Sequence, residues 1–136
     1  MTSDWNLPRC LAVEDAMRRE ALRNAENWTE QLRRGTLEMA VLLTVSPGRR
    51  YGLEIIRHLE EFTDLVLPEG TVYPLLTRLA RDGFLTAEWI ADEAPHPRKY
   101  YQLTPSGRAR LNNMCREFQA FTGKIDRLMK AAGRDV

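Results

Sequence analysis

Residues 70–81 place apolar side chains at spacings of three and four, the pattern of a helix with one buried face. The apolar members are Val72, Leu75, Leu76 and Leu79. The other positions form a polar, aromatic and basic face, which carries Thr71, Tyr73, Thr77, Arg78 and Arg81. We therefore expect a helix that begins near Gly70 and presents this second face outward.

The two ends of this helix carry signals of their own. Pro74 is expected in the first turn, because the backbone donor that proline lacks has no intrahelical partner there. Asp82-Gly83 is expected to end the helix, since glycine readily takes a positive φ angle.

After Gly83 the apolar pattern changes to the alternation that is typical of strands. Residues 85–90 and 98–103 alternate in this way, and residues 91–97 join them as a predicted loop. Tyr101 shares a strand face with Leu103, so we favour a core position for Tyr101 rather than for Tyr100. The stretch as a whole predicts a helix followed by a two-stranded ribbon.

Three further amphipathic segments precede this stretch. Residues 11–34 favour a helix with a thin apolar face, whose members are Val13, Met17, Ala21, Ala25, Trp28 and Leu32. Gly35-Thr36 is interpreted as a break and a cap, after which a short buried helix carries Leu37, Ala40, Val41, Leu43 and Thr44. Residues 51–62 repeat the helical pattern, with inward positions expected for Leu53, Ile56, Leu59 and Phe62.

The last helix is predicted to begin with Thr104 as its N-cap and Pro105 in its first position. Its apolar residues then alternate steps of three and four, as in a coiled coil, and they are Leu111, Met114, Phe118, Phe121, Ile125, Leu128 and Ala132. Such a stripe either packs on its own domain or joins two subunits. We favour dimerisation, because a small domain has little surface left to cover so long a stripe.

Together these elements predict a mainly α fold with a small β-hairpin, which is a winged helix-turn-helix with a helix added at each end. We divide the chain into an N-terminal extension helix (residues 1–34), a winged helix-turn-helix DNA-binding domain (35–104) and a C-terminal dimerisation helix (105–136). In this fold the helix from Gly70 enters the major groove of DNA.

Composition narrows the class of protein. The 136 residues, 43% of them hydrophobic, suffice for one core. Without a long apolar run or a signal peptide, the chain is expected to be cytoplasmic with no membrane partner. Its two cysteines lie far apart and suggest neither a disulfide framework nor a metal site, and no cofactor is expected.

The net charge of +1 is low for a nucleic-acid partner, although clustered arginines can still form a local basic surface.

An enzyme is not expected. Only His58 and His96 could serve as imidazole bases, and both are predicted to be solvent-exposed. No nucleophile elbow, phosphate-binding glycine loop or zinc-binding H-E-x-x-H motif occurs in the sequence.

Several motifs occur together in a fixed order. They are Y-G-L-E-I-I from Tyr51, G-T-V-Y-P-L-L-T-R-L from Gly70, D-G-F-L from Asp82 and R-K-Y-Y-Q-L-T-P-S-G from Arg98. In these motifs the sequence resembles the PadR family of bacterial transcriptional regulators over roughly residues 32–110. The resemblance implies a winged-helix repressor that dimerises through its terminal helices and whose affinity for a promoter is altered by a small molecule.

The resemblance also implies roles for individual residues. Thr71, Tyr73 and Pro74 match the exposed start of the family's recognition helix, and Arg98-Lys99 match the basic base of its wing. With Arg78 from the outward helix face, these residues are the expected contacts to a double-stranded DNA operator. The chain departs from the family where Pro68-Glu69 replaces a frequent serine, which puts the N-cap and the docking of this helix in doubt.

Aromatic residues outside this surface suggest a small hydrophobic or aromatic effector. Trp28, Phe118 and Phe121 are candidates to enclose it between the terminal helices, although simple interface packing is the alternative. Trp89 either packs under the wing or lines a ligand pocket. The competing function for the whole chain is a winged-helix protein-protein interaction module that does not bind DNA.

Overall fold

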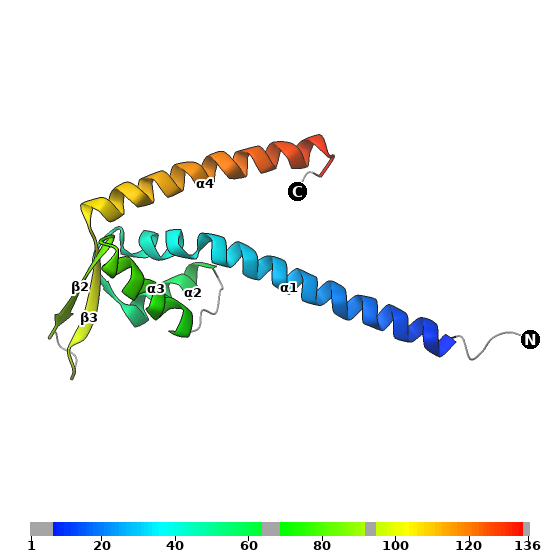
Figure 1. The fold of residues 1–136 in the computed structure, drawn as a ribbon, viewed down its shortest axis with the longest axis horizontal. Helices are drawn as coiled ribbons and strands as arrows, with labels where there is room; N and C mark the ends of the chain where they lie inside the picture. Colours follow the sequence, from blue (N-terminus) through cyan, green and yellow to red (C-terminus); the bar gives the residue numbers. More distant parts are fainter. Residues whose placement is uncertain (1–6, 64–68, 92–94, 135–136) are drawn as a thin grey trace, which may run out of the picture. The chain divides into compact units, whose positions relative to one another are not determined.

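The computed structural model describes residues 7–63, 69–91 and 95–134, and these divide into two units that meet between Leu37 and Glu38. Helix α1 spans Leu7–Val45, and its first part, up to Leu37, makes up the first unit. The second holds the end of α1 and all later elements (Figure 1). These are β1 (Arg50–Tyr51), α2 (Gly52–Thr63), α3 (Glu69–Arg81), β2 (Leu85–Ile90), β3 (Arg98–Leu103) and α4 (Pro105–Ala131).

The predicted helix break at Gly35-Thr36 is wrong, because α1 continues without interruption to Val45. The Thr36 hydroxyl donates to the Leu32 carbonyl oxygen at 2.8 Å, so it bonds back along its own helix instead of capping a new one. A glycine inside a helix costs only about 1 kcal/mol relative to alanine, which the surrounding helix-forming residues tolerate. The division of the chain into three functional regions stays a prediction.

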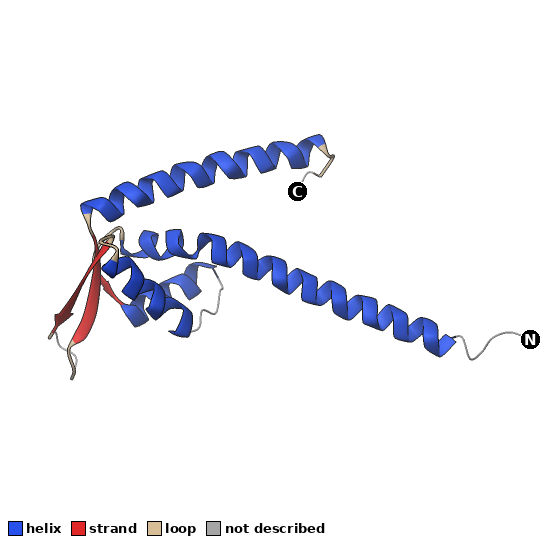
Figure 2. Cartoon of the chain, in the orientation of Figure 1, coloured by secondary structure: helices blue, strands red, loops and turns tan. Residues whose placement is uncertain are grey.

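The three strands form one antiparallel sheet in the order β1-β3-β2 (Figure 2). The register places Ala87 opposite Tyr101 and Trp89 opposite Lys99. The ribbon of β2 and β3 confirms the predicted strands, whereas β1 was missed. A strand of two residues is too short to show alternation, and only its pairing with β3 identifies it.

The core of the second unit lies where the end of α1, helices α2 and α3 and the sheet meet. Its most deeply buried members are Val41, Leu42, Val45, Ile55, Val72, Leu76, Leu79, Leu85 and Tyr101. The core position predicted for Tyr101 is confirmed, since only 3% of this residue is exposed.

Two residues that were predicted to face the core do not. Leu43 is exposed, and Phe62 is 75% exposed in the last turn of α2, where its ring contacts His58 at 4.7 Å between centroids. The buried stripe of α2 consists instead of Ile55, Ile56 and Leu59, of which Ile55 was not predicted. Helical spacing alone did not locate the edge of the stripe at the end of this helix.

Local caps fix both ends of the ribbon. Gly83 has a φ of 84°, and the Phe84 N–H donates to the Leu79 carbonyl oxygen at 2.9 Å, which confirms the predicted glycine stop of α3. Thr104 is the N-cap of α4, as predicted, and its Oγ1 accepts from the Gly107 N–H at 2.9 Å. The same hydroxyl donates to the Gly83 carbonyl oxygen at 2.7 Å and so ties the two helix ends together.

The predicted place of Pro74 in the first helical turn is wrong. Because α3 begins at Glu69, the proline lies in the second turn, where a backbone N–H would otherwise bond to the Gly70 carbonyl. Within the described residues, no helix is both long and apolar enough to cross a membrane.

Candidate nucleic-acid interface

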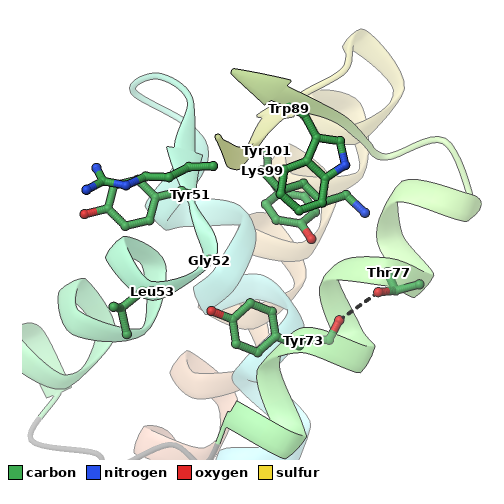
Figure 3. Close-up of a pocket in the computed structure, with 9 residues that line it drawn as sticks. Tyr51, Gly52, Leu53, Tyr73, Thr77, Trp89, Lys99 and Tyr101 are labelled. Atoms are coloured by element: carbon green, nitrogen blue, oxygen red, sulfur yellow. Dashed lines mark hydrogen bonds between the residues drawn. The ribbon is translucent and has the colours of Figure 1, made fainter. Parts of the chain in front are cut away.

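A hollow of about 510 Å³ opens where α2, α3 and the ribbon meet (Figure 3). The start of α2 and its flank contribute Tyr51, Gly52 and Leu53, and α3 contributes Tyr73 and Thr77. The ribbon supplies Trp89, Arg98, Lys99 and Tyr101. The described lining residues include four aromatic side chains and two positively charged ones, those of Arg98 and Lys99.

Tyr73 forms the wall of the hollow on the side of α3. Its side chain extends from the helix toward Gly52 and Leu53 and stays 37% exposed (Figure 3). Partial burial, and secondly the charge of Glu69, raise the pKa of the Tyr73 hydroxyl above its ordinary value. The hydroxyl is therefore neutral at physiological pH and can both donate and accept hydrogen bonds.

The two cations of β3 contact the faces of aromatic rings. The Arg98 guanidinium lies 4.4 Å from the centre of the Tyr51 ring. The Lys99 ammonium lies 5.9 Å from the Trp89 ring and 6.0 Å from the Tyr101 ring. Such cation–π contacts hold a charged group near the face of a ring.

Trp89 is 67% exposed, so it does not pack beneath the wing. Because it lies opposite Lys99 in the sheet and lines the hollow, it belongs to the same surface as the two cations.

The remaining predicted DNA contacts on α3 lie outside the hollow. Thr71 and Pro74 are exposed on α3. Arg78 faces Glu38 near the end of α1 at 3.6 Å, and Arg110 of α4 binds the same carboxylate at 2.8 Å. The Glu38 side chain is only 16% exposed. The charge of Arg78 therefore stabilises the fold through this ion pair.

The residues predicted for dimerisation differ in their surroundings. Leu111 is buried within the second unit and Met114 is half-buried, so both take part in the fold itself. The later members of the stripe are exposed along α4, and they are Phe118, Phe121, Ile125 and Leu128.

The candidate effector residues belong to both units. Trp28 is exposed on the first unit, and Phe118 and Phe121 are exposed on α4. The hollow that contains Trp89 is lined by none of these three residues. Among the described residues there is also no group of His, Cys, Asp or Glu that could hold a metal ion.

Five residues of the hollow were not predicted as site residues: Tyr51, Gly52, Leu53, Thr77 and Tyr101, of which Tyr101 was predicted only as a core residue. The sequence pattern placed Thr77 on the outward face of the helix, and this position could have identified it as a site residue. Tyr51, Gly52 and Leu53 depend on the pairing of β1 with β3, which the sequence pattern did not reveal.

The helix pair α2–α3, with the antiparallel ribbon after it, defines the winged helix-turn-helix class of proteins. The model of the transcriptional regulator PadR-like family matches residues 41–113, which hold the end of α1, helices α2 and α3, the three strands and the start of α4. The chain belongs to this family. We call residues 38–113 the winged unit.

Solved structures agree with the fold. A PadR-like transcription factor from Bacteroides fragilis is 35% identical, with a TM-score of 0.63 over 75% of this chain and 98% of its own. A PadR family regulator from Eggerthella lenta is 30% identical, with a TM-score of 0.71 over 84% of this chain and 96% of its own. Bacillus subtilis PadR in complex with operator DNA is 26% identical, with a TM-score of 0.54 over 59% of this chain and 45% of its own.

Proposed function

We propose that the protein is a sequence-specific DNA-binding transcriptional regulator, and more particularly a dimeric, ligand-responsive repressor of a palindromic operator. The observation that carries the proposal is that Tyr73 and Thr77 of α3 and the two cations of β3 line the same hollow. A groove reader and a phosphate clamp on one surface are the two parts that specific DNA binding requires.

Each part has a defined role in the proposal. The exposed face of α3 enters the major groove, where Thr71 and Tyr73 reach base edges or phosphates through their hydroxyls. Arg98 and Lys99 bind phosphates or the minor groove next to it, and their aromatic backing limits the motion of the two side chains. The solved complex of Bacillus subtilis PadR with operator DNA supports a DNA partner for this member of the family.

Salt-dependent binding tests the DNA partner. Fluorescence anisotropy with promoter fragments, including the promoter of the protein's own gene, should show binding that weakens steeply with salt as counterions are released. Replacing Arg98 and Lys99 together by alanine should weaken binding to every duplex and lower the slope of log affinity against log salt by about 1 per cation.

The matched control removes two exposed arginines from the first unit, Arg18→Ala with Arg23→Ala, and gives the same change in net charge. It should leave the salt slope unchanged. If no promoter fragment bound even at low salt, the DNA proposal would fail and the interaction module would be the better description.

The dimer is proposed because the exposed stripe of α4 continues for several turns with the spacing of a coiled-coil seam. A two-fold dimer presents two copies of α3, so its operator should be an inverted repeat with half-sites about one helical turn apart. Selection of bound DNA from random duplexes should return such repeats. Recovery of single half-sites alone would contradict the palindromic operator.

The effector is proposed because aromatic side chains stay exposed on the terminal helices, where a hydrophobic ligand could cover them. A small aromatic ligand should change tryptophan fluorescence and lower DNA affinity, and Trp28→Phe should remove most of the fluorescence change. A broad ligand panel that left both quantities unchanged would count against ligand control.

Deletion of the gene should raise transcription from a bound promoter, as expected for a repressor.

A further inference from the structure

Gly52, the first residue of α2, is buried against the Tyr73 side chain of α3. A methyl group at residue 52 would overlap the Tyr73 ring, and its three nearest neighbours would all be atoms of that side chain, with the hydroxyl oxygen at 3.1 Å. The φ angle of Gly52 is not positive, so other residues could adopt this backbone conformation. What the site requires is an empty space.

Gly107 provides an instructive contrast, because it is also buried at the start of a helix. A methyl group there would overlap the carbonyl oxygen of Phe84, which belongs to the backbone and cannot move by itself. At Gly52 the obstacle is the far end of one flexible side chain. A methyl group at residue 52 can therefore be accommodated if the Tyr73 ring swings away, with little effect on the fold.

The position of this ring matters for the proposed DNA interface. Tyr73 lies on the outward face of α3 and forms one wall of the hollow, with Arg98 and Lys99 among the other lining residues. When the ring lies against Gly52, its hydroxyl is directed toward α2 instead of away from the protein (Figure 3). A swing of the ring would thus change which part of a bound duplex the hydroxyl can reach.

We propose that Gly52 is a positioning residue for DNA specificity: by lacking a side chain it seats Tyr73 against α2 and so sets which DNA groups Tyr73 contacts. The inference rests on the proposed function, since it assumes that α3 reads DNA. Gly52 itself need not touch the duplex, and its whole effect passes through the Tyr73 ring.

The first experiment needs no DNA. In the free protein, nuclear Overhauser contacts are expected between the α protons of Gly52 and the ring protons of Tyr73, and Gly52→Ala should abolish the close packing of this ring. If the wild-type contacts were absent, the inference would be overturned whether or not the protein binds DNA. If they were present but no duplex bound, the proposed function would fail while the seat of Tyr73 would stand.

The second experiment is a double-mutant cycle on DNA binding. Gly52→Ala should lower affinity for the preferred site about tenfold, as expected for one lost base contact, and should shift the bases that are selected. The salt slope should stay as in the wild type, because no cation is changed. In a Tyr73→Ala background, where the space is free, Gly52→Ala should have no further effect.

An equal loss of affinity from Gly52→Ala with and without the Tyr73 ring would overturn the inference. Gly35→Ala is the matched control, since a methyl group at this helical glycine meets open space. It should leave the selected bases unchanged. If Gly52→Ala proved too unstable to measure, the double variant would still be compared with Tyr73→Ala alone, and any difference in selected bases between them would contradict the inference.

Discussion

The winged unit and the two helical arms use the same kinds of residue at the same spacing, yet they differ in what covers them. The arms are α1 before Leu37 and α4 after Met114. In the winged unit Leu42, Ile55 and Leu76 are fully buried. On the arms Trp28 is 59% exposed and Leu128 is 65% exposed. The comparison teaches that an apolar stripe predicts a covered surface but does not say which surface covers it.

The charged contacts differ in the same way. In the winged unit Glu38 is mostly buried between Arg110 and Arg78, which come from two other helices. On the arm Asp15 and Arg19 form a pair at 2.6 Å within one helix, and both side chains are at least half exposed. Contacts of the first kind join elements, whereas contacts of the second kind support a single helix.

The largest expected effect is on the core of the winged unit. Leu76→Ala should lower the free energy of unfolding by about 2–5 kcal/mol, because it leaves a cavity beside other fully buried side chains. Urea denaturation followed by circular dichroism measures the loss. Leu128→Ala should change the free energy of unfolding of the monomer by less than about 0.5 kcal/mol, because this side chain is exposed there. Equal losses at the two positions would break the comparison.

The next effect concerns the proposed seam on α4. Phe118→Glu should convert the dimer to a monomer, because burying an unpaired carboxylate in an apolar interface costs at least about 2 kcal/mol. Sedimentation velocity should report half the mass while the circular dichroism of the winged unit is retained. Gln119→Glu adds the same charge one residue away from the seam and should leave the dimer intact. An unchanged mass for Phe118→Glu would refute this role of the stripe.

Two glycines of α4 offer a finer comparison. Gly107→Ala forces a methyl group against the Phe84 carbonyl, and the overpacking should cost about 1–3 kcal/mol of stability. Gly123→Ala, in the same helix, meets open space and should stabilise the helix by up to about 1 kcal/mol. Thermal melting of the two variants should therefore shift in opposite directions. Shifts of the same sign would show that the close contact at Gly107 is not what limits this position.

The smallest effects compare the two kinds of ion pair. Glu38→Gln should lower stability by about 1 kcal/mol, because two arginines lose a mostly buried charged partner. Asp15→Asn should cost no more than about 0.5 kcal/mol, as is usual for an exposed pair within one helix. Denaturation at low and high salt should show the larger salt dependence for the Asp15 pair.

Local signals in the sequence predicted much of the framework. The strands at residues 85–90 and 98–103, the Gly83 stop and the Thr104 cap were correct, since each depends on residues close together in the chain. The family motifs also identified the winged fold. By contrast, the sequence did not show that the Thr36 hydroxyl would bond to carbonyl oxygens of its own helix instead of capping a new one.

What the sequence determined by itself is therefore helices α2, α3 and α4, the ribbon of β2 and β3, the winged fold and the residue types on the outward face of α3. The tertiary structure decided that β1 joins the sheet, that Trp89 lines an open hollow and that Tyr73 rests against Gly52. The physical reason is the separation along the chain of the residues that must interact. Periodicity and capping arise within one or two turns of chain, whereas each of these three features needs residues about 20 to 50 positions apart to meet, which only the packing of the whole unit arranges.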